Sequence, residues 1–346
     1  MKQTRLLSER LRSHRLSAPA RTVTDAAAHM LAVQSQDFVA GRWALGVRTR
    51  GATLRDVDRA FTRGRLVRAW TMRGTLHIVP APDLGWILSV TADRQRQQAA
   101  TRHRQLGVDT AMLTVAERAL RERIAREGRG VTRAEAFEAF SAAGIDPTAQ
   151  RGYHLLFALT VGGILCQGPV VGREQLFVLA EEWVPSSAEP DDPLSELFVR
   201  YIAGHGPAGV ADFAWWSGLT LGTAREAAER SRGRVAEVED GLFAALSAPR
   251  RSGDREVHAL PAFDEYYLSY ADRSTVCTAE QAAVVGPGKN GMVRATLVES
   301  GRLAGTWSHT GVRDGAVPVA EFFASASPGL TESAVAALER FRAFLV

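Results

Sequence analysis

Apolar residues recur every three to four positions over the first part of the chain and then give way to short extended runs. The three-to-four spacing predicts helices at residues 4–16, 23–36 and 53–64. Val, Ile, Trp and Thr dominate residues 65–72 and 75–80, and Arg73-Gly74 between these two runs favours a tight turn. This stretch therefore predicts three helices followed by a two-stranded hairpin.

The same order of elements is predicted twice more. Helical spacing recurs at residues 113–126, 131–144, 148–163, 193–206, 209–218 and 220–231. Each set of three is followed by two short apolar segments, and in the last set these segments flank Asp240-Gly241, a strong hairpin signal. Three helices and a hairpin form the winged-helix variant of the helix-turn-helix, and a tandem array is stronger evidence than one copy.

The pattern changes after about residue 255. Alternating segments at 292–298 and 302–309 predict a small antiparallel sheet or barrel, and helical spacing returns at 331–346. We therefore predict an α+β, helix-dominated fold. Its domains are winged-helix units 1–110, 111–185 and 186–250, followed by a C-terminal β-barrel or sheet with a closing helix at 251–346.

Composition excludes several classes of protein. The chain has 346 residues, 46% of them apolar, and no apolar run approaches the roughly 20 residues needed to span a bilayer. The basic N-terminus lacks an apolar core and cleavage site of a secretion signal, so we expect a cytoplasmic protein. Two cysteines, Cys166 and Cys277, are too few for a disulfide framework or a cysteine-based zinc site. We expect no metal and no cofactor.

The charge is distributed unevenly along the chain. Residues 1–130 hold 24 Lys and Arg against 11 Asp and Glu, a net charge of +13, whereas residues 131–346 have a net charge of −9. All basic residues except Lys2 and Lys289 are arginine, which binds phosphates through two parallel hydrogen bonds. A basic N-terminal third favours a polyanionic partner such as DNA, although arginines that only solvate helix faces would give the same count.

Two glutamines, Gln34 and Gln36, end one of the apolar helical segments. On a continuing helix, residues two apart point in directions that differ by about 200°, so they converge only if the helix ends or the chain becomes extended. Asp37 and the nearby Gly41 favour such an end, with Asp37 as a cap or turn former. From the residues alone, surface polar side chains or caps are the commoner interpretation of such a pair.

Five ordered blocks carry a resemblance to a known family. They are residues 32–51, 65–84, 209–219, 260–273 and 288–307. In this order and spacing they resemble the bacterial winged-helix DNA glycosylase family, over essentially the whole chain. The resemblance implies a C-shaped scaffold of three winged helices and a β-barrel that holds double-stranded DNA. It also implies hydrolysis of the N-glycosidic bond of N7-alkylated purines, including unhooking of interstrand crosslinks.

The family signature is Gln, an apolar residue and then Gln in the AlkZ-like branch, or Asp in the last position in the YcaQ-like branch. Gln34 and Gln36 match both glutamines and are our candidate catalytic residues, whereas the polar Ser35 departs from the pattern. N7-alkylation makes a purine cationic, so the base leaves without a general acid. Two amides are then sufficient to orient a water and present carbonyl dipoles to the cationic sugar.

Candidate DNA contacts lie mainly in the first winged-helix unit. They are Arg48, Arg50, Arg65, Arg68, Arg73, His77, Lys289 and Asn290. Strand alternation sends Arg65 and Arg68 to opposite faces, so at most some of these residues touch DNA. His77 is also interpretable as a buried structural histidine, and the turn at 288–291 as an exposed turn without a partner. Trp215 and Trp216 are expected to be core aromatic residues.

A competing interpretation is a non-catalytic DNA-binding protein, either a transcription regulator or a protein that shelters alkylated DNA. Tandem winged helices alone favour this alternative, because winged helices usually read the major groove. The acidic pair Asp264 and Glu265 does not indicate a metal site, since no second cluster of ligands accompanies it. Nothing in the sequence requires more than a monomer.

Overall fold

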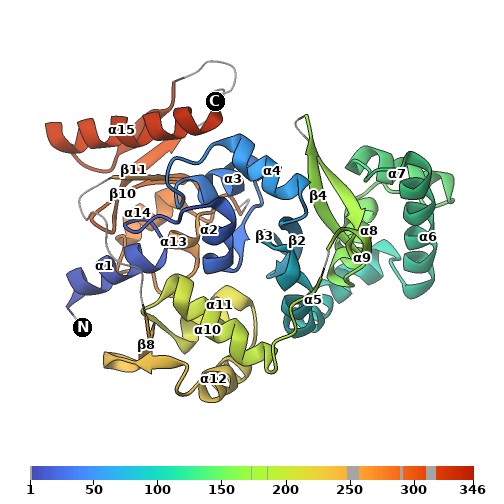
Figure 1. Cartoon of the computed structure of the whole chain (residues 1–346), viewed down its shortest axis with the longest axis horizontal. Helices are drawn as coiled ribbons and strands as arrows, with labels where there is room; N and C mark the ends of the chain where they lie inside the picture. The colour runs from blue at the N-terminus through green and yellow to red at the C-terminus, as the bar shows by residue number, and fades with distance from the viewer. Residues whose placement is uncertain (1, 173, 185, 248–256, 289–290, 309–316) are drawn as a thin grey trace. The chain divides into compact units, whose positions relative to one another are not determined.

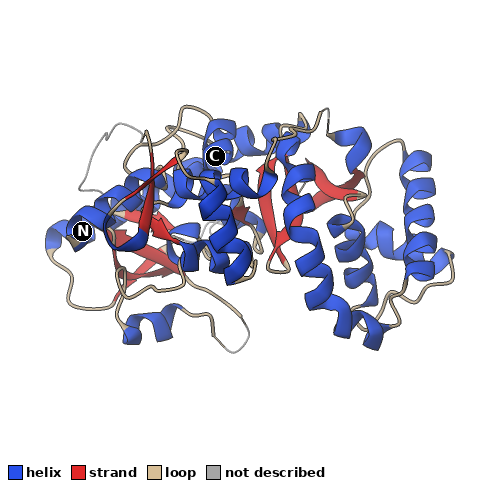
Figure 2. Ribbon diagram, turned by 90° about the horizontal axis from the view of Figure 1, so that it is seen from below, coloured by secondary structure: helices blue, strands red, loops and turns tan. Residues whose placement is uncertain are grey.

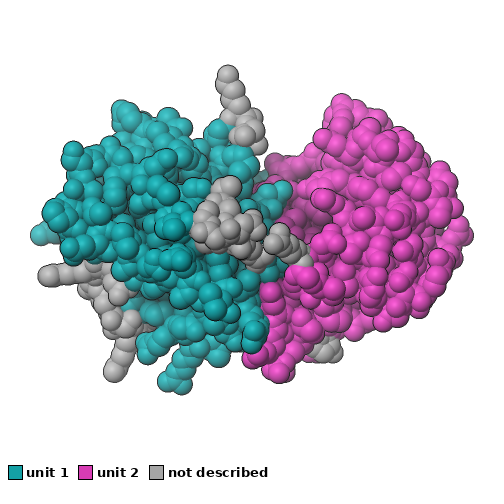
Figure 3. Space-filling model, turned by 90° about the horizontal axis from the view of Figure 1, so that it is seen from above, with its two compact units in different colours: residues 1–57, 194–346 teal, residues 58–193 magenta. Residues whose placement is uncertain are grey.

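The computed structural model describes residues 2–172, 174–184, 186–247, 257–288, 291–308 and 317–346 (Figure 1). The chain forms two compact units (Figure 3). Unit 1 combines residues 1–57 with 194–346, and unit 2 is residues 58–193. The four domains proposed from the sequence are a finer division and stay a prediction, but the first of them is shared between the two units.

Unit 1 contains both ends of the chain. Its helices are α1 (Gln3–Ser13), α2 (Val23–Met30), α3 (Phe38–Gly46), α10 (Pro193–His205), α11 (Val210–Ser217), α12 (Leu221–Arg230), α13 (Glu265–Leu268), α14 (Ala279–Val285) and α15 (Pro328–Leu345), and α4 (Leu54–Thr62) crosses the unit boundary. Its strands are β1 (Val33–Gln34), β6 (Ala208–Gly209), β7 (Val235–Glu237), β8 (Leu242–Ala245), β9 (His258–Leu260), β10 (Ala295–Glu299), β11 (Arg302–Ser308) and β12 (Val319–Phe322). A 3₁₀ turn, Glu239–Gly241, joins β7 to β8, which pair as the hairpin predicted around Asp240-Gly241.

The C-terminal part of unit 1 is a four-stranded antiparallel sheet in the order β12-β11-β10-β9. Helix α15 covers it: the Phe341 ring lies 4.9 Å from that of Trp307 in β11 and 5.3 Å from that of Trp43 in α3. Gly46 permits this packing, since a Cβ there would lie 2.6 Å from the Phe344 ring. A helix therefore closes the sheet and also fixes α3.

The N-terminal helix is part of the same core. Leu7 and Leu11 of α1 are buried in one apolar cluster with Tyr266, Tyr267 and residues of the C-terminal sheet. Their spacing of four residues places both side chains on one face of the helix. The beginning of the chain is thereby packed against segments about 250 residues later.

Unit 2 is one antiparallel sheet with helices. Its elements are β2 (Leu66–Met72), β3 (Thr75–Pro80), a 3₁₀ turn (Ala81–Asp83), α5 (Leu84–Leu106), α6 (Thr110–Glu127), α7 (Arg133–Ala142), α8 (Arg151–Val161), β4 (Leu165–Val171), β5 (Glu174–Leu179) and α9 (Ala180–Trp183). Its strands lie in the order β3-β2-β4-β5, with Ala69 opposite His77 and Cys166 opposite Val178. Trp70 and Phe157 belong to the shared core of this unit.

Most predicted helices and hairpins are present, and helix predominates among the described residues (Figure 2). Several helices differ from the prediction, among them α3 and α5. Asp37 and Gly41 favour an end of the predicted helix 23–36, and that helix does end before them, but Gly41 lies inside a further helix, α3, that the sequence did not predict. Helix α5 is not predicted because its buried apolar residues stop at Ala92 and return only at Leu106, so most of its length shows no apolar periodicity. No helix in the described ranges is both long and apolar enough to cross a membrane.

Candidate active site

The segment that carries Gln34 and Gln36 leaves helix α2 early. The helix begins after the cap Thr22, which accepts the Asp25 N–H, and it ends at Met30 because Leu31 adopts a left-handed φ of 63°. Val33 and Gln34 then form the short strand β1. The predicted helix 23–36 is therefore too long by six residues: the helix ends before both glutamines, Gln34 lies in the strand and Gln36 lies in a bend.

Helix α3 begins directly after Gln36. Asp37 is its N-cap and accepts a hydrogen bond from the Ala40 N–H at 3.0 Å. This confirms the interpretation of Asp37 as a cap. Gln36 is exposed at the start of α3, whereas Gln34 is 6% exposed.

Ser35 lies between the two glutamines and is completely buried. Its side chain packs against Gly41 of α3, where a Cβ on residue 41 would lie 2.5 Å from the Ser35 Cβ. Successive side chains of an extended segment point to opposite sides. Ser35 is directed into the protein, and the two glutamines flank it, with Gln34 buried and Gln36 exposed.

The backbone of Gln34 is anchored to a segment far along the chain. Its N–H donates a 2.7 Å hydrogen bond to Oε1 of Glu265, the first residue of α13. The other carboxylate oxygen, Oε2, accepts from Nε1 of Trp216 at 3.0 Å and from Oγ of Ser269 at 2.5 Å. Nε2 of His205 lies 3.6 Å from the same oxygen. Glu265 is fully buried.

Glu265 was not a candidate from the sequence, where the pair Asp264 and Glu265 was considered only as a metal site. The sequence feature that could have indicated Glu265 is the acidic pair directly before two aromatic residues, Tyr266 and Tyr267, which are buried in the structure. A carboxylate in such a run needs buried donors, but the sequence does not identify them. Among the described residues, no three His, Cys, Asp or Glu side chains group as a metal site.

Arg48 has a structural role that corrects its prediction as a DNA contact. Its Nη1 and Nη2 each donate a 2.8 Å hydrogen bond to the Asp264 carboxylate, and Nη1 also donates to the Ala44 carbonyl at 3.0 Å. Both side chains of the ion pair are inaccessible to solvent. The guanidinium therefore holds α3 to the segment before α13 and cannot reach a phosphate in this structure.

Buried aromatic and histidine side chains surround this region of unit 1. His14 Nε2 lies 2.9 Å from Tyr270 Oη, which donates to the His205 carbonyl at 2.6 Å. Burial, reinforced by the proximity of His205, lowers the pKa of His14 well below its usual value. Burial likewise raises the pKa of Tyr270. Both groups are therefore neutral near pH 7, and they act as hydrogen-bonding parts of the core.

The predicted DNA contacts in unit 2 have different environments. His77 is fully buried, with Nδ1 3.0 Å from Thr71 Oγ1 and Nε2 3.4 Å from Arg73 Nη2. Its prediction as a DNA contact is therefore corrected in favour of the structural interpretation. Arg68 is 8% exposed and donates to Gln167 Oε1 at 2.8 Å. The β2–β3 turn holds Arg73 partly exposed.

The remaining candidates are exposed or lie outside the described residues. Arg50 and Arg65 are exposed, so their role as phosphate contacts stays a prediction. Lys289 and Asn290 lie outside the described residues. Trp216 is a core residue as predicted, but Trp215 is 47% exposed and donates to the Leu268 carbonyl.

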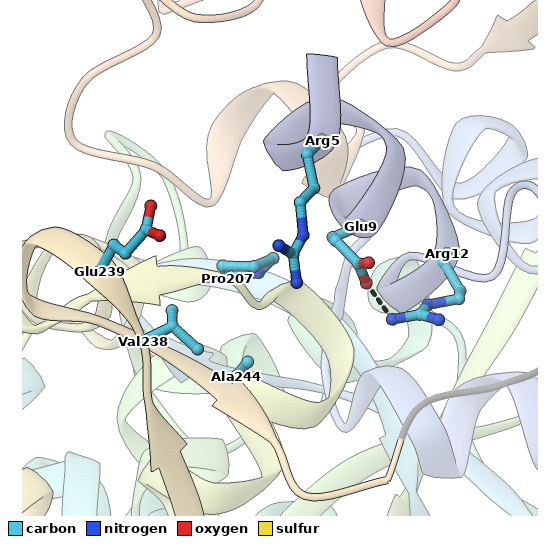
Figure 4. Close-up of a pocket in the computed structure, with 7 residues that line it drawn as sticks. All are labelled: Arg5, Glu9, Arg12, Pro207, Val238, Glu239 and Ala244. Atoms are coloured by element: carbon cyan, nitrogen blue, oxygen red, sulfur yellow. Dashed lines mark hydrogen bonds and ion pairs between the residues drawn. The ribbon is translucent and has the colours of Figure 1, made fainter. Parts of the chain in front are cut away.

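A pocket of about 390 Å³ lies elsewhere in unit 1 (Figure 4). It is lined by Arg5, Glu9, Arg12, Pro207, Val238, Glu239 and Ala244. Glu9 and Arg12 form an ion pair at its edge, as Figure 4 shows. Neither candidate glutamine lines this pocket, so the glutamine segment and the pocket are separate features of the unit.

Comparisons with known proteins agree on one family. The model of the family "DNA glycosylase AlkZ-like" matches residues 27–344. A curated protein of Streptomyces sahachiroi, the interstrand DNA cross-link repair glycosylase, is 24% identical over 314 residues, covering 83% of this chain and 82% of that protein. The solved structure of Streptomyces sahachiroi DNA glycosylase AlkZ matches with a TM-score of 0.79 and 20% identity, covering 99% of this chain and 97% of the other.

Proposed function

Because the chain belongs to the AlkZ-like DNA glycosylase family, we propose that it hydrolyses the N-glycosidic bond of N7-alkylated purines in double-stranded DNA. The similar Streptomyces protein is named for the repair of interstrand crosslinks. We extend the proposal to such lesions, so that the enzyme unhooks crosslinks in DNA repair or in self-resistance to a genotoxic compound. The family also favours this function over a non-catalytic DNA-binding protein.

In the proposed mechanism, the amides of Gln34 and Gln36 hold the attacking water. An N7-alkylated purine carries a positive charge and leaves without protonation, so the demanding step is the placement of water at C1′ of the sugar. Positive charge grows on the sugar as the bond breaks, and amide carbonyl dipoles stabilise it. Correct placement alone contributes several kcal/mol to such reactions, roughly 7–11 kcal/mol in the best intramolecular cases.

The observation that carries this proposal is the local backbone of the segment. Ser35 is buried against Gly41, and the Gln34 N–H is bonded to Glu265. Gln34 and Gln36 are thus the polar residues on either side of an inward side chain, directly before the capped start of α3. This arrangement supports a paired role that a continuous helix would not permit.

The chain's lysines favour simple hydrolysis over strand cleavage. A glycosylase that also cuts the strand forms a Schiff base between an amine and the sugar aldehyde. Lys2 and Lys289 are the only lysines of the sequence. We therefore propose a monofunctional glycosylase. We further propose that it acts as a monomer in the cytoplasm, where its substrate lies. In this proposal Arg50, Arg65 and Arg73 contact phosphates.

The test is base release from a duplex that carries one N7-methylguanine, followed by alkali to reveal abasic sites. We expect Gln34→Ala and Gln36→Ala each to reduce the single-turnover rate by about 10²-fold or more, by analogy with the loss of an oriented dipole in other sites. Because neither change removes a cation, the Kd for DNA should change by less than about 2-fold.

Gln3→Ala is the matched control, since Gln3 is an exposed glutamine of α1 in the same unit. It should retain full activity. Unchanged base release by the Gln34→Ala/Gln36→Ala protein would refute the catalytic assignment. A wild-type protein that binds the lesion but releases no base would support the non-catalytic alternative.

A further inference from the structure

Glu265 is a fully buried carboxylate whose bonding partners include the backbone of the candidate catalytic segment. A buried carboxylate is costly unless hydrogen bonds compensate for the lost hydration. Here a backbone N–H, an indole N–H and a hydroxyl donate to its two oxygens at 2.5–3.0 Å. The site therefore stabilises the carboxylate, and the carboxylate in turn fixes the groups that donate to it.

The arrangement of donors requires two acceptor oxygens. Oε1 accepts from Gln34 and Oε2 from Trp216, and neither of these N–H groups is able to reverse its role. A glutamine amide has one acceptor atom and would turn its NH₂ toward one of the two donors. Of the three donors only the Ser269 hydroxyl can reorient. A glutamine at 265 would thus lose the bond to Gln34 or the bond to Trp216.

We propose that Glu265 is a positioning residue for catalysis, which holds the Gln34 backbone so that its side chain meets the water and the sugar. This inference rests on the proposed function of Gln34. Glu265 does not touch the substrate, because it has no exposed surface. It acts through the 2.7 Å hydrogen bond from the Gln34 N–H.

The segment that Glu265 holds has few other local constraints. Helix α2 ends at Met30, Leu31 has a left-handed φ, and β1 consists of Val33 and Gln34 alone. The position of Gln34 therefore depends on long-range contacts more than on local secondary structure. A displacement of about 1 Å in a catalytic group costs up to roughly 100-fold in rate.

The first experiment compares wild type with Glu265→Gln, in single-turnover excision of N7-methylguanine and in binding to the same duplex. We expect the rate of excision to fall by about 10- to 100-fold, while the Kd changes by less than about 2-fold, because Glu265 is fully buried. A lowered rate with unchanged binding distinguishes positioning from a general loss of structure. An unchanged rate in correctly folded Glu265→Gln would overturn the proposal.

Glu265→Gln carries some risk of misfolding, so a milder variant is measured beside it. Ser269→Ala removes the hydroxyl that donates to Oε2 and leaves the Gln34 contact in place. We expect a loss of about 2- to 5-fold in rate at unchanged Kd, since the carboxylate is held less firmly. If Glu265→Gln does not fold and Ser269→Ala excises at the wild-type rate, the proposal fails.

Glu135→Gln is the matched control in unit 2. Glu135 also accepts a backbone N–H through its carboxylate, from Thr132 at 2.7 Å in the capping box of α7. Its replacement removes a carboxylate charge that faces a backbone N–H, at a place remote in sequence from the glutamines. We expect the wild-type excision rate for Glu135→Gln, and a loss equal to that of Glu265→Gln would count against a specific role.

A double-mutant cycle separates this inference from the proposed function. If Glu265 acts through Gln34, Glu265→Gln should cause little further loss in a Gln34→Ala protein. A full additional loss in that background would overturn the inference while leaving Gln34 catalytic. Undiminished excision by Gln34→Ala itself would instead refute the proposed catalytic role of Gln34, and a wild-type protein that excises no base would refute the proposed function.

Discussion

At the scale of single residues, Ser35 is the position at which this chain departs from the Gln, apolar, Gln pattern of the family it resembles. The structure gives a steric account of the serine. Ser35 is completely buried, and its side chain occupies the space beside Gly41. A small side chain at 35 and a glycine at 41 therefore form a matched pair that allows β1 and α3 to approach closely.

Gly41→Ala tests this match. The new Cβ would lie 2.5 Å from the Ser35 Cβ, well inside van der Waals contact, so the segment must move. We expect a loss of about 1–3 kcal/mol in the free energy of unfolding and a lower excision rate. Urea unfolding and single-turnover excision measure the two effects.

Two further variants show whether a destabilisation by Gly41→Ala arises from the clash with Ser35. Ser35→Gly in the Gly41→Ala protein should restore part of the stability, because it removes the atoms that clash. Gly222→Ala in α12 is the control, since its Cβ would meet only the Thr220 hydroxyl oxygen at 3.8 Å. That change should be neutral or stabilising by up to about 1 kcal/mol. Equal destabilisation by both alanines would contradict the steric account.

At the scale of elements, local patterns predicted most of the secondary structure. The capping box Thr132 and Glu135 begins α7, and the residues around Asp240-Gly241 form a hairpin. These signals are short-range, so the sequence displays them directly. By contrast, α2 ends at Met30, where Leu31 adopts a left-handed φ, and the short strand that follows donates a hydrogen bond to Glu265. Apolar spacing continues past that point and could not reveal the break.

In the candidate site, too, the sequence revealed residues that carry a local motif but not residues that are linked by long-range contacts. Gln34 and Gln36 were found from a motif, whereas Glu265 lies 231 residues from Gln34 in sequence. Arg48 was predicted to bind phosphate because an arginine in a basic segment carries no local mark of burial. Its partner Asp264 lies 216 residues away, and nothing in the spacing of the two residues connects them.

The pair Arg48 and Asp264 joins α3 to the segment before α13, and its removal should be costly. Taking away one member leaves a buried charge without its partner, so we expect Arg48→Ala or Asp264→Ala to destabilise the protein by about 3–5 kcal/mol. Thermal and urea unfolding measure the loss. Replacing both residues with apolar ones should recover part of it.

The exposed pair Arg342 and Glu339 supplies the comparison, with side chains 46% and 55% accessible. Its disruption should cost less than about 1 kcal/mol. If Arg48→Ala were no more destabilising than Arg342→Ala but weakened DNA binding, the original prediction of a phosphate contact would be restored.

At the scale of the whole molecule, buried histidines contribute to the dependence of stability on pH. Burial, with nearby Arg15, lowers the pKa of His29 from 6.5 to about 4. Burial, with nearby Arg340, lowers that of His258 to about 4. The unfolded chain binds protons at these groups below about pH 6.5, whereas the folded chain does so only near pH 4. Their contribution to stability is therefore complete above pH 6.5 and is lost as the pH falls toward 4.

We expect the free energy of unfolding to decrease between pH 7 and pH 5, as measured by urea denaturation at each pH. His29→Gln should be less stable than wild type at pH 7 but should lose less stability on acidification, because one proton-binding group of the unfolded chain is gone. Identical pH dependence in the two proteins would show that His29 does not contribute.

The long sequence separation between Gln34 and its hydrogen-bond partner Glu265 also has a consequence for biosynthesis. Glu265, which accepts the hydrogen bond from the Gln34 N–H, follows Gln34 by 231 residues in the sequence. At translation rates of about 5–20 residues per second, roughly 10 to 50 s separate the synthesis of these two residues. During that interval the nascent polypeptide carries both glutamines without the carboxylate that we propose positions the first of them. The enzyme then becomes fully active only after the last quarter of the chain, which contains Glu265, has been synthesised. A prematurely terminated product without this part would have little capacity to create abasic sites in the genome.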